Sequence, residues 1–100
     1  PLTVPPVEEI VPKRIDAAKT KEVLESAKEF VKMIPTSDHE TAENFAKAES
    51  ERLGIKLGDY MMPVRMAVTG SRVSPPLIGS IMALGVEESL KRIHMTLATL

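Results

Sequence analysis

The sequence predicts an all-α protein, a small bundle of about five helices with short connections. Apolar residues recur at steps of three and four through successive segments, which is the spacing of amphipathic helices. No segment alternates apolar and polar residues as a half-buried strand does, and breaks rich in Pro, Gly or Ser separate the segments. A chain of 100 residues supports a single core, which all the helices would share.

Residues 1–18 are expected to precede the folded helical domain, which we place at residues 19–100. The first segment holds four of the eight prolines and shows no helical period, so we interpret it as a Pro-rich linker or the tail of a preceding domain. The chain begins with Pro1 and has no initiator methionine, basic patch or signal-like apolar segment at this end. We therefore expect either a processed product or a fragment of a longer protein, and we favour the fragment.

The first two helices are expected to form a hairpin. The first runs from about Thr20 and ends before Pro35, and its apolar stripe comprises Val23, Leu24, Ala27, Phe30, Val31 and Ile34. The segment Ser37 to Glu40 matches a capping box, in which the serine and glutamate side chains bond free backbone N–H groups at the helix start. A second helix should follow and end at Gly54, with a thinner stripe of Ala42, Phe45, Ala46 and Leu53.

The third helix is expected to end at Gly70, and its stripe comprises Leu57, Tyr60, Met61, Val64 and Val68. Pro63 fits this helix only near its start, because a proline in mid-helix removes a hydrogen bond and forces a kink. We expect the N-cap at Asp59 or Tyr60, where most backbone donors up to Met62 have no intrahelical partner in any case.

Ser74 and Pro75 are expected to begin the fourth helix. Ser is a favoured N-cap, Pro is favoured at the first helical position, and a residue before Pro is held extended, as a cap should be. The buried side of this helix comprises Leu77, Ile81 and Leu84, and Gly85 follows. The fifth helix has the most regular stripe, and Glu87 and Glu88 lie in its first turn, where the helix dipole favours negative charge. That stripe comprises Val86, Leu90, Ile93, Leu97 and Leu100.

Composition and motifs exclude several classes of site. The chain has no cysteine, so a disulfide or a thiolate metal site is impossible, and His39 and His94 are too isolated to suggest a metal cluster. It contains no phosphate-binding glycine-rich loop, no histidine pair at metal spacing and no nucleophile motif, so we expect no catalytic residue. No apolar run approaches the roughly 20 residues that span a bilayer, and we expect no membrane partner.

Charge and turn chemistry single out residues 61–77, "MMPVRMAVTGSRVSPPL". The net charge is only -1, but residues 52–100 carry six Lys and Arg against three Asp and Glu, whereas residues 1–51 carry seven against eleven. If either half meets a polyanion, it is the second. Arg65 follows Val64 by one position and therefore projects about 100° away from the buried stripe. From the residues alone, this corner is either a binding site or an ordinary surface arginine beside a tight turn.

A family resemblance covers most of the chain. Residues 53–93, "LGIKLGDYMMPVRMAVTGSRVSPPLIGSIMALGVEESLKRI", closely resemble the C-terminal segment of bacterial-type glutamyl-tRNA synthetases. That family shows "KLG", "PLR", "A-TG", "SPGL" or "SPPL", "LG" and "RI" in this order. The upstream segments "IVPKRIDAAKTKEVLESAKEFV" and "DHETAENFAKAESERLGIKLG" also resemble the preceding helices of that domain, so the likeness extends over residues 10–97.

The resemblance implies an all-helical, C-terminal anticodon-binding domain of a class I aminoacyl-tRNA synthetase. The family residues that lie against the anticodon bases correspond here to Arg65, Ser74, Pro75 and Leu77, and Arg72 is a further candidate contact. The implied partners are the anticodon loop of the tRNA for glutamate and the catalytic body of the same enzyme, in the cytoplasm. ATP and Mg would belong to that body, because signatures of "HIGH" and "KMSKS" type are absent here. This chain carries no cofactor in that interpretation and is not active alone.

The residue chemistry agrees with RNA recognition. A guanidinium can stack on or hydrogen-bond an unstacked loop base, and the Ser74 hydroxyl can face a base edge. Pro75 and Pro76 have no N–H to attract phosphate, which favours shape and base contact at this helix start. Ile78 stands where many relatives have phenylalanine, so an aromatic contact there is weakened or absent. The alternative is a helical protein-interaction module without RNA binding, since amphipathic hairpins present grooves to partner helices.

Overall fold

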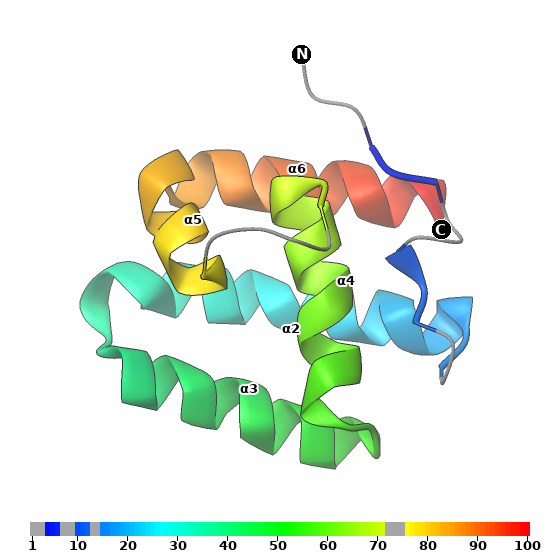
Figure 1. The fold of residues 1–100 in the computed structure, drawn as a ribbon, viewed down its shortest axis with the longest axis horizontal. Coiled ribbons are helices and arrows are strands. Elements are labelled where there is room, and N and C mark those ends of the chain that lie inside the picture. The colour runs from blue at the N-terminus through cyan, green and yellow to red at the C-terminus, as the bar shows by residue number, and fades with distance from the viewer. Residues whose placement is uncertain (1–3, 7–9, 13–14, 72–75) are drawn as a thin grey trace.

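Five α-helices and one short 3₁₀ helix form the part of the fold that the structure describes (Figure 1). The structure is a computed structural model, and it describes residues 4–6, 10–12, 15–71 and 76–100. In chain order the elements are α2 (Ala17–Met33), η1 (Ile34–Thr36), α3 (His39–Leu53), α4 (Leu57–Thr69), α5 (Leu77–Leu84) and α6 (Val86–Thr99). No described residue forms a β-strand, so the predicted all-α class is confirmed.

Helix α4 crosses the middle of the molecule. In Figure 1 it runs from the level of α3 to the level of α6 and passes across α2. It contacts α2, α3, α5 and α6, and the side chains of Tyr60, Val64 and Val68 are fully buried. The stripe of α6 packs on the same core, with Ile93 fully buried at its centre. The packing of α2, α3, α5 and α6 around α4 therefore sets where the two ends of α4 lie.

Helices α2 and α3 pack as the predicted hairpin (Figure 1). The rings of Phe30 and Phe45 stack across it, with centroids 6.4 Å apart. Helix α2 begins at Ala17, three residues before the predicted start at Thr20. The reason is its N-cap, Asp16, whose carboxylate accepts a hydrogen bond of 2.8 Å from the backbone N–H of the third helical residue.

The predicted capping box is wrong, because the N-cap of α3 is Asp38 and not Ser37. The Asp38 Oδ1 accepts a hydrogen bond of 2.7 Å from the backbone N–H of Thr41. The N–H of Ser37 bonds back to the Met33 carbonyl at 3.0 Å, which extends the preceding helical turns as far as the serine. An ionised carboxylate is also a stronger acceptor than a hydroxyl at the positive end of a helix. The hydrogen bond with Thr41 lowers the pKa of Asp38.

Pro63 lies inside α4, so the predicted N-cap at Asp59 or Tyr60 is also wrong. The helix begins at Leu57, and the N–H of Tyr60 already bonds to the Lys56 carbonyl at 3.2 Å. Pro63 therefore removes the N–H that would bond to the Asp59 carbonyl. Tyr60 and the proline ring are both buried, and burial of a large apolar side chain contributes about 1.5–3 kcal/mol, which offsets the lost hydrogen bond.

Helix α5 begins at Leu77, two residues later than predicted, and its N-cap is Pro76 rather than Ser74. Pro76 has φ -50° and ψ 135°, outside the helical region. A residue before a proline is disfavoured from the α conformation, so a double proline disfavours a helix start at its first member. Gly85 follows the helix as predicted, with a positive φ of 87°, and the predicted core residue Ile81 is buried.

A chain of polar side chains, buried at Tyr60 and exposed at Arg52, links α2, α3 and α4. The Ser26 hydroxyl donates to Glu49 Oε1 at 2.8 Å and lies 2.7 Å from the Tyr60 hydroxyl. Because a carboxylate only accepts, the single proton of Ser26 faces Glu49, and Tyr60 must donate to Ser26. Arg52 completes the chain with two bonds to Glu49, at 2.8 and 2.9 Å. These bonds lower the pKa of Glu49, and burial raises the pKa of Tyr60 to about 12.

Two residues of the N-terminal segment pack on the helices. Ile10 is fully buried, and Ile15 contacts the core beside the start of α2. The division of the chain between residues 18 and 19 stays a prediction. Within the described residues, no helix combines the length and the apolarity that crossing a membrane requires.

Candidate nucleic-acid interface

Arg65 lies on the C-terminal half of α4, between the buried residues Val64 and Met66. Its side chain is half-buried, because α4 is packed on most of its circumference. Burial of the stem and exposure of the head restrict an arginine to few orientations. A guanidinium held in this way can present its planar set of donors to a nucleobase or a phosphate.

A tight turn follows Arg65. The Thr69 hydroxyl donates to the Arg65 carbonyl at 2.8 Å and accepts a hydrogen bond of 3.2 Å from the N–H of Ser71. Gly70 ends α4 as predicted, with a φ of 73° in the left-handed region, and its N–H bonds to the Met66 carbonyl at 2.9 Å. The turn at residues 69–71 is therefore built by both side-chain and backbone bonds.

Arg92 of α6 bonds to the same end of α4. Its Nη1 donates to the Val68 carbonyl at 2.8 Å, and its Nε donates to Glu88 Oε2 at 2.9 Å. The hydrogen bond with Arg92 lowers the pKa of Glu88. The spacing of Glu88 and Arg92 by four residues is a recognisable signal of a helical ion pair. The contact with Val68 has no such signal, because the two residues are far apart in the sequence.

Leu77 is only 3% exposed and belongs to the hydrophobic core, as does Ile78. Ile78 therefore packs into the protein. Helix α5 contacts α4, so the helices that carry Arg65 and Leu77 are neighbours. Little of the Leu77 side chain faces solvent, and any contact with a base must use its exposed edge.

Three of the predicted contact residues, Arg72, Ser74 and Pro75, lie outside the described residues. Their assignment stays a prediction. The described part of the candidate interface consists of Arg65, the turn at residues 69–71 and the first turn of α5.

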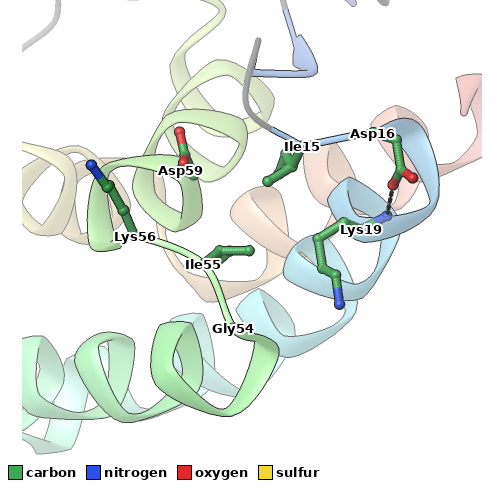
Figure 2. Close-up of a pocket in the computed structure, with 7 residues that line it drawn as sticks. All are labelled: Ile15, Asp16, Lys19, Gly54, Ile55, Lys56 and Asp59. Atoms are coloured by element: carbon green, nitrogen blue, oxygen red, sulfur yellow. Dashed lines mark hydrogen bonds between the residues drawn. The ribbon is translucent and has the colours of Figure 1, made fainter.

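An open hollow lies at the other end of α4 (Figure 2). Its lining consists of Ile15, Asp16, Lys19, Gly54, Ile55, Lys56 and Asp59. Two lysines and two aspartates leave it without net charge, and Lys19 also pairs with Glu22 at 2.9 Å. Helix α4 has 13 residues, so this hollow is separated from Gly70 by about 20 Å. The hollow is therefore not part of the candidate interface and does not favour an anion.

Metal ligands do not gather in the described part of the chain, which contains no group of three or more His, Asp or Glu placed to hold an ion. The chemistry that this corner offers is recognition, through a guanidinium and a rigid turn.

Comparison with known proteins gives one family. The model of the anticodon binding domain family matches residues 3–97. Glutamate–tRNA ligase of Treponema denticola is 55% identical over 96 residues, which cover 95% of this chain. The enzyme of the same name from Treponema pallidum is 45% identical over 84 residues, and that from Roseiflexus sp. is 34% identical over 99 residues.

The matched region is a small part of each relative. It covers 19% of the Treponema denticola protein and 20% of the Roseiflexus protein. This chain therefore spans about a fifth of the length of the curated relatives it matches. No solved structure matches it significantly.

Proposed function

This chain belongs to the anticodon binding domain family, and we propose that it recognises the anticodon loop of the tRNA for glutamate as part of a glutamate–tRNA ligase. The observation that carries this proposal is the match of residues 3–97 to the family, together with relatives of that name along nearly the whole chain. The likeness includes the segment that holds Arg65 and the turn after it.

In this proposal, Arg65 makes the principal contact with an anticodon base. Its side chain is half-buried, and a guanidinium has donors in one plane and a flat face for stacking, both of which suit an unstacked base in an RNA loop. Ser74, Pro75 and Leu77 form the other side of the contact, and Arg72 adds to it. Leu77 contributes the exposed edge of a side chain whose remainder anchors α5 in the core.

The parent protein supplies the reaction. We propose that a catalytic body outside this chain binds ATP and Mg and joins glutamate to the tRNA in the cytoplasm. With a net charge of -1, this domain provides only part of the affinity for tRNA, and the catalytic body provides many of the backbone contacts. The domain then contributes mainly to the choice of tRNA.

The experiment is Arg65→Ala in the full-length parent protein, with aminoacylation measured at varied tRNA concentration. We expect a loss of roughly 1–3 kcal/mol in kcat/KM for tRNA, because a base-contacting arginine is removed. The matched control is Lys47→Ala, which removes one exposed positive charge from α3. Unchanged kinetics for Arg65→Ala, or an equal loss for Lys47→Ala, would contradict the assigned role.

A further inference from the structure

The C-terminal end of α4 is fastened to α6 by Arg92. The last four carbonyls of a helix have no intrahelical partner and need other donors. The N–H of Gly70 bonds to the Met66 carbonyl at 2.9 Å, and Arg92 Nη1 bonds to the Val68 carbonyl at 2.8 Å. Arg92 and Val68 are 24 residues apart, so this bond joins two distant segments.

Glu88 fixes the orientation of the Arg92 side chain. Its Oε2 lies 2.9 Å from Arg92 Nε, and the two side chains are 22% exposed for Arg92 and 38% for Glu88. A guanidinium holds its donors in one plane, so bonds through Nε and Nη1 define both its position and its tilt. The cation also lies at the negative end of α4, and the carboxylate lies in the first turn of α6, so both helix dipoles favour the arrangement.

The hydrogen bond between Arg92 and Val68 lies next to Arg65, the proposed recognition residue. Val68 follows Arg65 by less than one helical turn on α4. Helix α5 contacts α6 and is joined to it through Gly85. Helix α6 therefore holds both sides of the proposed interface, α4 through Arg92 and α5 through direct packing.

We propose that Arg92 is a positioning residue for tRNA recognition, which fixes the end of α4 against α6 and so holds Arg65 in place relative to α5. The inference rests on the proposed function. Arg92 directs its Nε and Nη1 donors at Glu88 and Val68, so these two bonds act on the protein and not on the RNA. Its effect on binding passes through Arg65.

The test uses Arg92→Gln and Glu88→Ala in the full-length parent protein, with the affinity for the glutamate tRNA measured by filter binding. We expect each change to weaken binding roughly 5- to 20-fold, in the lower part of the usual range of coupling between linked sites. Glu88→Ala discriminates better between positioning and charge, because it removes a negative charge and makes the protein more positive. Electrostatics alone predicts tighter binding of a polyanion, whereas loss of positioning predicts weaker binding.

Two controls separate positioning from charge and from general damage. Lys91→Gln removes a neighbouring exposed charge of α6 and should weaken binding much less than Arg92→Gln. The second control adds Arg92→Gln to Arg65→Ala, where the additional loss should disappear because the group that it positions is absent. Circular dichroism of each variant checks that the helices remain, and Glu88→Ala decides the question if Arg92→Gln does not fold.

The outcomes distinguish this inference from the proposed function. If Arg65→Ala does not weaken binding, the proposed role of Arg65 fails. If Arg65→Ala weakens binding but Glu88→Ala leaves it unchanged or tightens it, only the inference about Arg92 fails. An equal effect of Arg92→Gln with and without Arg65 also overturns it.

Discussion

The hydroxyl of Ser26 connects the buried Tyr60 hydroxyl to the partly exposed Glu49 carboxylate. Its removal should cost more free energy of unfolding than removal of the Tyr60 hydroxyl. Tyr60 is fully buried and donates to Ser26 at 2.7 Å, while Ser26 donates to Glu49 at 2.8 Å. In Tyr60→Phe, Ser26 keeps its bond to Glu49 and only one hydrogen bond is lost. In Ser26→Ala, the Tyr60 hydroxyl stays buried without a partner, and Glu49 loses a donor.

The magnitudes follow from this difference. A lost hydrogen bond costs about 0.5–1.5 kcal/mol, whereas a buried polar group left without a partner costs about 1–3 kcal/mol. We expect Tyr60→Phe to lower the free energy of unfolding by about 1 kcal/mol and Ser26→Ala by about 2 kcal/mol. The first value corresponds to a fall in Tm of roughly 4–8 °C for a domain of this size.

The double variant gives the decisive comparison. Once Ser26 is alanine, Tyr60→Phe removes the unpartnered hydroxyl and should be neutral or stabilising, although it destabilises the unmodified chain. Urea unfolding of the four proteins, followed by circular dichroism, measures all the terms. If Tyr60→Phe costs the same free energy with and without Ser26, or if Ser26→Ala costs less than Tyr60→Phe, the polar chain as described is refuted.

Two further predictions concern the same helix. Burial raises the pKa of Tyr60 to about 12, so the folded state holds this proton more tightly than the unfolded state, and stability is lost as pH rises from about 10 to 12. The free energy of unfolding of the unmodified chain exceeds that of Tyr60→Phe at neutral pH, and this difference should shrink by about 1 kcal/mol by about pH 11. A difference that stays constant with pH would argue against the raised pKa of Tyr60. Because Tyr60 is the single tyrosine and the chain has no tryptophan, tyrosinate absorbance reports this ionisation directly. Gly70→Ala should destabilise the chain by about 1–2 kcal/mol in thermal unfolding, because φ is 73° there although nothing lies within 4 Å of an added Cβ. A neutral result would show that the turn relaxes.

Helix identity could be predicted from the sequence, while several helix ends could not. The stripes around Phe30 and Ile93 are local patterns with a helical period, and the structure buries both residues fully. Asp38 replaces Ser37 as the cap because the preceding helical turns continue through Pro35 to Thr36, two residues beyond the end that Pro35 suggests. Pro63 is accepted inside α4 because tertiary burial outweighs one backbone bond, and this balance is not visible in a local pattern.

The candidate site also contains features that could be predicted from the sequence and features that could not. Helical spacing and turn chemistry predicted the end of α4 at Gly70 and singled out Arg65 as a candidate, but the role of Arg65 follows from the family resemblance and stays a prediction. The sequence also predicted Leu77 as both a core residue and a contact, and its exposure of 3% shows how far the first role limits the second. The bond from Arg92 to Val68 could not be anticipated, because it joins residues 24 positions apart through a backbone carbonyl.

Affinity for glutamate tRNA with single anticodon bases replaced is the most direct test of the central proposal. The measurement compares the full-length parent protein with its Arg65→Ala variant on the unmodified tRNA and on each altered tRNA. We expect one base replacement to weaken binding to the parent protein by roughly 1–3 kcal/mol and to have little further effect once Arg65 is absent. Equal affinity for all the tRNAs in both proteins would contradict anticodon recognition through this domain.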